Sequence, residues 1–327
     1  KKEKMKEEEK SSKNDKSENP TTLFSEETYF QRLKRFTQMV DWRHAFTTNK
    51  QLEAAKEAVH EEEKGGKKAT NLAKKRVDTC VHPETKENIF FPLRTSFIVP
   101  ANTTLDCLML LASRSGYPAA IVSSQVLNQS YNALHYHAYR NGTSHNESTQ
   151  KRITAFALAT TSSVIAALSI NRFTKIRPNR LLRVCGPFLA VSIADILNLG
   201  TMRSIEYTRG IRAYHPDTKA PLKTLPRSRR LGALAVAQSI ATRVLAAMPI
   251  LTIPPLIIQA LDKRINHPFY TRFFRYPLLA LFVASMIQIS VPTTFALFKQ
   301  YGQVDVQWLE KPYQESGLKR VLYNKGI

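Results

Sequence analysis

The densest group of polar side chains in an otherwise apolar part of the chain is the run Asn128-Gln129-Ser130-Tyr131-Asn132. Asn128 and Asn132 are four residues apart, so they share one face if this segment is a helix. Amide side chains both donate and accept hydrogen bonds, which suits the zwitterionic head of an amino acid or a hydroxyl group. Asn128, Gln129, Ser130 and Asn132 are therefore candidate solute ligands. The alternative is that they hydrogen-bond to neighbouring helices and hold those helices together.

Two long apolar segments each contain a single charged residue, Asp195 in one and Arg243 in the other. Charges within a membrane are costly, so each requires a partner or a function. Asn198 shares a helix face with Asp195, whereas Arg203 lies about 12 Å further along if the helix continues. Arg243 is therefore the better partner for Asp195, and either arginine could bind the carboxylate of a solute. Structural pairing and solute binding both remain open for these residues.

Other chemistries find little support in the sequence. The histidines near the polar run have no carboxylate or cysteine at metal-ligand spacing, and the three cysteines are far apart with no CxxC pattern. No phosphate-binding loop, nucleophile elbow or HExxH helix is present. We therefore expect no metal, no cofactor and no enzymatic activity.

The formal charge of +22 could indicate a nucleic-acid partner. However, the surplus of Lys and Arg lies mainly in short loops between apolar runs, which is where membrane proteins carry these residues. We therefore expect membrane lipid, and no nucleic acid, around this chain.

Long uncharged segments predict the elements that would position these groups. Residues 153–170 and 277–298 contain no charged residue, and like the two segments above they approach or exceed the roughly 18–20 residues that cross a bilayer. Residues 95–113 and 115–139 are weaker and could form one broken span with a re-entrant piece, or two short spans. We predict an all-α, multi-pass membrane bundle over residues 95–300 with about five transmembrane helices, four or six being the alternatives.

The segment around Arg243, residues 231–261, is too long for one straight span at about 1.5 Å per residue. Pro249, Pro254 and Pro255 each remove a backbone donor, and we expect them to break the helix. Broken helices within membranes frequently form solute sites. A simple proline kink without a site is equally consistent with the sequence.

The regions outside the bundle are polar. Residues 1–20 form a charged tail that we expect to be disordered, and residues 301–327 form a C-terminal tail. Residues 21–94 form an N-terminal amphipathic helical region, a soluble arm packed on itself or on the membrane surface. Its first helix carries a run of apolar residues at helical spacing: Phe30, Leu33, Phe36 and Val40. A second helix begins near residue 50 and ends at Gly65-Gly66.

The segment His82-Pro83-Glu84-Thr85-Lys86 is echoed by His215-Pro216-Asp217-Thr218-Lys219. Proline followed by an acidic residue and threonine is typical of turns, so we expect a shared turn and not an internal repeat.

These motifs occur together, in the same order, in the sideroflexin family of mitochondrial inner-membrane carriers, which the chain resembles from about residue 30 to its end. His82, Pro83, Thr85 and Glu87 match the family's HPDTGE-like signature, with Lys86 in place of its glycine. The run 128–133 resembles NQSFNA, the stretch 194–206 resembles AN-x-x-N…MR…E with Asp195 in place of an asparagine, and residues 323–327 resemble YFNKGL.

The resemblance implies a helical inner-membrane protein, and some family members carry serine. Our main hypothesis is a transporter of a small, polar, serine-like amino acid that works by alternating access without covalent chemistry. The alternative is a non-transporting structural or assembly subunit of an inner-membrane complex. In that case the polar groups would satisfy one another, partner subunits would be expected, and no solute-sized cavity would exist.

Overall fold

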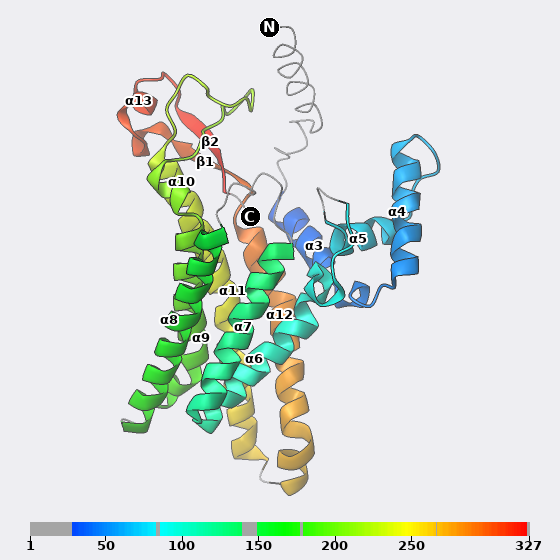
Figure 1. The fold of residues 1–327 in the computed structure, drawn as a ribbon, viewed down its shortest axis with the longest axis vertical. Coiled ribbons are helices and arrows are strands. Elements are labelled where there is room, and N and C mark those ends of the chain that lie inside the picture. Colours follow the sequence, from blue (N-terminus) through cyan, green and yellow to red (C-terminus); the bar gives the residue numbers. More distant parts are fainter. Residues whose placement is uncertain (1–27, 83–85, 139–148, 177–178, 266, 326–327) are drawn as a thin grey trace.

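The computed structural model describes residues 28–82, 86–138, 149–176, 179–265 and 267–325. They form a membrane-type helical bundle, with an N-terminal arm and a C-terminal cap at the same end (Figure 1). The tail of residues 1–20, for which disorder is predicted, lies outside the described residues.

The arm contains the two predicted helices and a third one. Its elements are α3 (Tyr29–Met39), η1 (Trp42–His44), α4 (Asn49–Glu63), α5 (Asn71–Cys80), η2 (Phe91–Leu93) and η3 (Thr95–Phe97). Thr28 and Thr48 begin α3 and α4 with reciprocal capping boxes. Gly65, in the left-handed region at φ 82°, follows the end of α4 as predicted. The predicted apolar face of α3 is only partly correct, because Phe30 is exposed whereas Val40 is buried.

Six long helices of the described residues form the bundle. They are α6 (Ile98–Ser115), α7 (Pro118–Ala138), α8 (Thr149–Ile176), α9 (Arg180–Met202), α11 (Arg229–Arg264) and α12 (Arg275–Leu297). All except α7 are long and apolar enough to cross a membrane, which gives the expected five apolar spans among the described residues. Each helix packs against the next, and α12 packs against α6, so the helices form a closed ring in sequence order.

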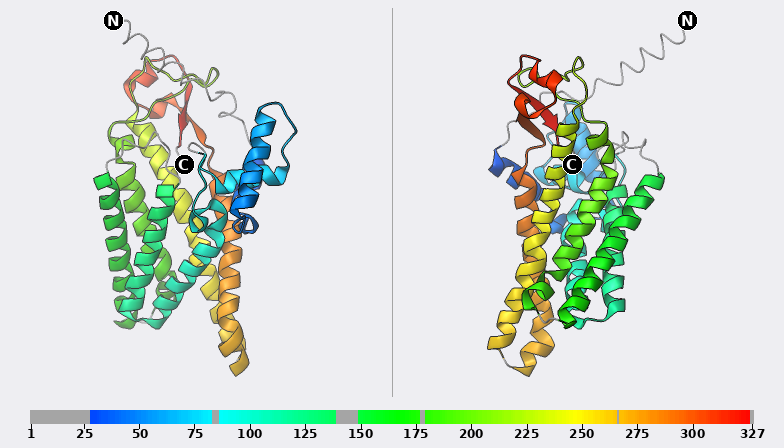
Figure 2. Two further views of the ribbon diagram at one scale, coloured as in Figure 1. Left: turned by 45° about the vertical axis from the view of Figure 1, so that its right-hand side comes forward. Right: turned by 90° about the vertical axis from the view of Figure 1, so that its left-hand side faces the viewer.

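The weak segments at the start of the bundle form two antiparallel helices. Gly116 ends α6 in the left-handed conformation at φ 68°, and α7 then runs back beside α6 and α8 (Figure 2). The more polar α7 is therefore a full member of the ring. Because α6 begins beside the arm and α12 ends beside it, the six described helices run alternately away from the arm and back toward it.

The predicted breaks in α11 are wrong. The helix is continuous over 36 residues even though Pro249, Pro254 and Pro255 lie inside it. A proline removes only its own backbone donor, and in apolar surroundings a wider break would leave further backbone groups without partners. The hydroxyl of Ser290 on α12 donates to the carbonyl of Ala246 at 2.9 Å, one turn before Pro249, and so tethers the two helices there.

The C-terminal region is a folded cap and not a tail. Strand β1 (Tyr301–Asp305) pairs antiparallel with β2 (Arg320–Asn324), with η6 (Val306–Trp308) and α13 (Lys311–Gln314) between them. The cap also contains the loop that follows α10 (Ser204–Thr208). Its core buries Val321 and Tyr323 against Leu231 at the start of α11. The cap therefore covers the end of the bundle where α9 and α11 meet.

The shared turn is confirmed. In the first turn the amide of His82 donates to the carbonyl of Glu87, and the amide of Lys86 donates to the carbonyl of His82. The second turn, which begins at His215, has the same two hydrogen bonds. The last motif residue of each turn has a positive φ, 59° at Lys86 and 56° at Lys219. Of the family-motif residues, Pro83 and Thr85 lie outside the described residues.

Candidate functional site

Asp195 and Arg243 form an ion pair inside the bundle. Asp195 on α9 and Arg243 on α11 approach to 3.6 Å between Oδ1 and Nη1, and their side chains are 10% and 37% exposed. The two helices are neighbours in the ring, so these charges in the middle of their apolar segments can meet. The predicted partner of Asp195 is therefore confirmed. The Asp195 carboxylate is largely shielded from solvent by the surrounding helices, so its attraction to Arg243 is stronger than it would be in water.

One face of α7 carries a polar stripe that leads toward this pair. Gln125, Asn128, Asn132 and His135 recur at steps of three and four residues and so lie on one side of the helix. Gln125 and Asn128 are buried. His135, at the end of the stripe, lies within electrostatic range of Arg243. The two asparagines were predicted as site residues from the sequence, whereas Gln125 and His135 were not, although their spacing from the asparagines was the available signal.

Several polar atoms inside the ring have no hydrogen-bond partner among the described residues. They are Gln125 Oε1 and Gln129 Nε2 on α7, and Ser192 Oγ on α9, one turn before Asp195. Among the described residues, no hydrogen bond joins these α7 amides to a side chain of a neighbouring helix. The helix-packing alternative required such bonds, because an unsatisfied buried polar group costs about 1–3 kcal/mol. These atoms can instead bind water or a polar solute.

The remaining predicted ligands have different surroundings. Ser130 and Asn132 are half-buried on α7, and Asn198 is half-buried on α9. Arg203 belongs to the cap, because its guanidinium binds Glu206 with two hydrogen bonds of 2.6 Å and donates to Ser239. Arg203 is therefore engaged at the end of the bundle and does not join the pair of Asp195 with Arg243.

The cap closes this end of the ring. Arg203 also donates to the carbonyl of Lys325 at 2.5 Å, and the hydroxyl of Tyr323 donates to Gln238 of α11 at 2.9 Å. The Lys325 side chain is almost completely buried, with its ammonium 5.4 Å from the ring centre of Phe298. Burial, followed by repulsion from Arg203 and Arg32, lowers the pKa of Lys325 to about 8.

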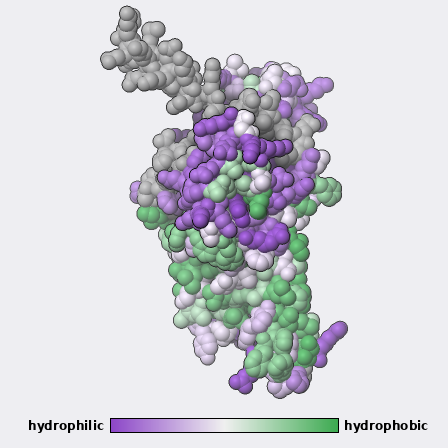
Figure 3. Space-filling view, turned by 90° about the vertical axis from the view of Figure 1, so that its right-hand side faces the viewer, coloured by the Kyte–Doolittle hydropathy of each residue, from purple (hydrophilic) through white to green (hydrophobic). Residues whose placement is uncertain are grey.

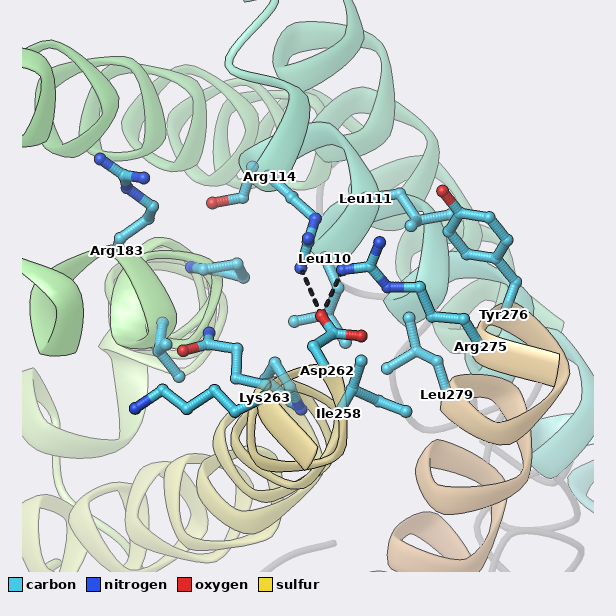
Figure 4. Close-up of a pocket in the computed structure, with 15 residues that line it drawn as sticks. Leu110, Leu111, Arg114, Arg183, Ile258, Asp262, Lys263, Arg275, Tyr276 and Leu279 are labelled. Carbon is cyan, nitrogen blue, oxygen red and sulfur yellow. Dashed lines mark hydrogen bonds and ion pairs between the residues drawn. The ribbon is translucent and has the colours of Figure 1, made fainter. Parts of the chain in front are cut away.

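A cavity of about 650 Å³ lies near the opposite end of the bundle, and we call it the vestibule. It is surrounded by α6, α9, α11 and α12, far from the cap (Figures 1 and 4). Its lining residues are Leu110, Leu111, Ser113, Arg114, Arg183, Val184, Pro187, Pro255, Ile258, Gln259, Asp262, Lys263, Arg275, Tyr276 and Leu279. Among the predicted site residues only Pro255 lines it.

Charged side chains of the vestibule are arranged around Asp262. Its Oδ2 accepts from Arg275 at 2.5 Å and lies 3.6 Å from Arg114, while the exposed side chains of Arg183 and Lys263 also line the vestibule and extend away from Asp262 (Figure 4). Four cations against one anion leave the vestibule positive, which favours carboxylate-bearing solutes. None of these charged residues was predicted as a site residue from the sequence. Each stands at the end of an apolar segment, a position that membrane proteins ordinarily give to interfacial charges.

A second, smaller cavity of about 10 Å³ lies on the other side of the contact between α6 and α9. It shares Ser113, Arg183 and Pro187 with the vestibule, and Ser124 and Gln125 of α7 also line it. Its volume is at the lower limit for one water molecule. The vestibule and the polar stripe of α7 are therefore separated by little more than one layer of side chains.

Comparison with known proteins adds to this geometry. The family model described as Sideroflexins matches residues 18–327. Sideroflexin-1 of Ovis aries is 32% identical over 318 residues, and that of Homo sapiens is 31% identical over the same length. Both alignments cover 93% of this chain and 95% of the relative. Sideroflexin-2 of Mus musculus is 29% identical over 313 residues, covering 92% of this chain and 94% of the relative. No solved structure matches the chain.

Proposed function

Because this chain belongs to the sideroflexin family and is a multi-pass membrane protein, we propose that it carries a small, polar, serine-like amino acid across the mitochondrial inner membrane. It does so by alternating access, with no cofactor and no covalent step. The observation that carries the proposal is the ion pair of Asp195 with Arg243, which lies within the ring and near the end of the polar stripe of α7.

The chemistry of the pair fits a zwitterion. Arg243 is the donor for a solute carboxylate, and Asp195 is the acceptor for its ammonium group. A solute that inserts between the two charges exchanges one ion pair for two, so no charge is left without a partner. Asn128 and Asn132 on α7 offer donors and acceptors for a polar side chain such as a hydroxyl.

The difference between the two ends of the bundle supports this proposal. The positive vestibule gives a solute carboxylate a favourable approach from one side, and the cap covers the other side. Gln125 borders the small cavity between the vestibule and the stripe. Movement of α6 against α9 would join the vestibule to the stripe, because these helices separate the two cavities.

The test is uptake of labelled L-serine by purified protein in proteoliposomes. We expect saturable uptake by the wild type, and its loss in Asn132→Leu with normal membrane insertion and abundance. Loss of abundance in step with uptake would instead support a packing role for Asn132. Absence of wild-type uptake above empty liposomes, for serine and for other small amino acids, would favour the structural or assembly role.

A set of three variants separates transport from structural pairing at Asp195 and Arg243. Asp195→Asn and Arg243→Gln each leave one charge unpaired, so each should lower the apparent melting temperature. Because Arg243 is partly exposed, the expected loss of stability is about 1–3 kcal/mol. The double variant leaves no unpaired charge and should recover most of that loss. Uptake should stay at least tenfold reduced in all three. If the pair is only structural, uptake returns in the double variant together with stability.

Asp106→Asn is the matched control for removing a buried carboxylate from a span. Asp106 is buried on α6 and forms no ion pair within the described part of the chain. Its replacement should therefore cause no loss of stability of the kind expected for Asp195→Asn. An equal loss in both variants would show that the effect is not specific to the pair.

A further inference from the structure

Large aromatic side chains are exposed together on the arm. Phe90, Phe46 and Trp42 are 71%, 59% and 50% exposed, and Phe91 is also exposed. The Phe46 and Phe91 rings are 5.9 Å apart between centroids, so these two side chains form one continuous surface. We call Trp42, Phe46, Phe90 and Phe91 the aromatic face. Clustered exposure of this kind marks a surface that binds something, because water solvates it poorly.

The aromatic face is held in shape by buried groups. The Arg94 side chain is buried and donates to the carbonyl of Thr47 at 2.7 Å and to that of Ile89 at 3.1 Å. It thereby joins the segment that carries Phe46 to the segment that carries Phe90 and Phe91. The Phe91 ring also packs on Phe97, with centroids 4.6 Å apart. The face is consequently preformed and does not depend on loose chain.

The position of the face relative to the spans indicates what covers it. Trp42 lies in η1, which contacts both η3 and α6, and the first apolar span runs from Thr95 to Ser115. The same arm reaches the end of the last span, because Arg32 Nε donates to the carbonyl of Ala296 at 3.0 Å. The hydrophilic surface of the arm gives way directly to the apolar belt of the bundle (Figure 3). The aromatic face therefore lies where two spans leave the bilayer.

From this placement we propose that the arm docks on the surface of the membrane that the bundle spans, with the aromatic face inserted at the level of the lipid headgroups. Aromatic rings are favoured at that depth, where one edge is apolar and the other is wet. Arg43, beside Trp42, is mostly exposed and can meet lipid phosphates while Asp41 holds its guanidinium at 2.6 Å. The proposal does not depend on which solute is carried.

The chain offers a direct test because it contains two tryptophans, Trp42 and Trp308. The Trp308→Phe variant leaves Trp42 as the only indole, and it is reconstituted into vesicles of phosphatidylcholine brominated at defined acyl positions. We expect the emission of Trp42 to be quenched more strongly by bromine near the glycerol than by bromine near the chain end. Iodide in the buffer should quench it weakly. The reciprocal Trp42→Phe variant reports Trp308, which lies in the cap, and should show the opposite pattern.

A second variant tests the contribution of the neighbouring aromatic side chains to this contact with lipid. In the Trp308→Phe background, Phe46→Ser with Phe90→Ser should reduce the quenching of Trp42 by brominated lipid at least twofold. Both side chains are exposed, so the helical circular dichroism signal should not change. Trp42 that is quenched by iodide and not by brominated lipid would overturn the proposal. That result would leave the aromatic face as a surface for another protein.

Discussion

At the residue scale, Lys86 and Lys219 occupy a backbone conformation that costs an L side chain about 1–2 kcal/mol. Each ends a turn in which its own amide donates back to a histidine carbonyl, so the hydrogen bonds of the turn maintain the positive φ. Glycine reaches this region without a steric cost, which explains physically why a glycine suits the matching position of the family's signature.

Lys219→Gly should stabilise the protein, by about 0.5–1 kcal/mol, because relief of the strain exceeds the extra entropy that glycine adds to the unfolded chain. The measurement is the apparent melting temperature in detergent. Lys223→Gly is the matched control, since Lys223 is an exposed lysine of the same loop without a positive φ, and this change should lower the melting temperature. A lower melting temperature for Lys219→Gly would mean that the lysine side chain itself supports the turn.

A contact between two charged residues can be predicted from the sequence only when few oppositely charged residues are available to pair with each of them. Arg243 was predictable for Asp195 because the other strong spans carry no second cation. The vestibule was not predictable, because Arg114, Arg183 and Arg275 stand at the ends of three different helices. Nothing in their local sequence distinguishes a residue that points into a cavity from one that points to lipid headgroups.

At the element scale, the positions of the apolar helices were predictable from their length and lack of charge. The breaks expected at the prolines of α11 and the tail expected at the C-terminus were wrong. The prolines of α11 suggested a break because each removes a donor, but neighbouring turns and packing keep the helix continuous. The cap escaped prediction because its strands are short and gain their stability from packing on α11, which is distant in sequence.

The close packing of α10 against the start of α11 predicts that a side chain at Gly232 would destabilise the cap. A Cβ added to Gly232 would overlap the backbone carbonyl of Glu206, whereas a Cβ added to Gly200 would meet nothing within 4 Å. Gly232→Ala should therefore push α10 from α11, disturb the bonds of Glu206 to Arg203, and destabilise the cap by about 1–3 kcal/mol. Gly200→Ala, inside α9, should be neutral or stabilising by up to about 1 kcal/mol.

Limited proteolysis of the cap, followed by mass spectrometry, distinguishes these two variants. Gly232→Ala should be cleaved within residues 204–228 or 301–325 faster than the wild type, and Gly200→Ala should match the wild type. Equal resistance of all three proteins would show that α10 can move without loosening the cap.

At the scale of the whole molecule, the closed ring of helices could not be read from the sequence. Hydropathy locates each helix but contains no information about neighbours, so the contact of α12 with α6 and the division of the ring by α6 and α9 came only from the structure. This division separates the vestibule from the polar stripe. It is also the reason that the predicted ligands and the vestibule involve almost entirely different residues.

The arm, the bundle and the cap meet at Lys325, where a buried ammonium faces two arginines, Arg32 and Arg203. The pKa of Lys325 is lowered from 10.5 to about 8 in the folded protein, mainly by burial and then by these charges. Between these values the unfolded chain holds a proton that the folded chain lacks, so stability rises with pH from about 8 to 10.5. Below about pH 8 the penalty is fully present, on the order of 3 kcal/mol.

Lys325→Met removes the charge and keeps most of the packing, so its apparent melting temperature at pH 7 should exceed that of the wild type by several degrees. The gain should be somewhat below the full penalty, because the ammonium's contact with the Phe298 ring contributes about 1 kcal/mol in the wild type. The difference in melting temperature between Lys325→Met and the wild type should shrink steadily as the pH rises from 8 to 10, because the wild type then loses its buried proton.

Lys319→Met, at an exposed position of the cap, should have the melting temperature of the wild type at every pH. A constant difference across this pH range, or a lower melting temperature for Lys325→Met at pH 7, would contradict a buried charge at this junction and make Lys325 a stabilising residue instead.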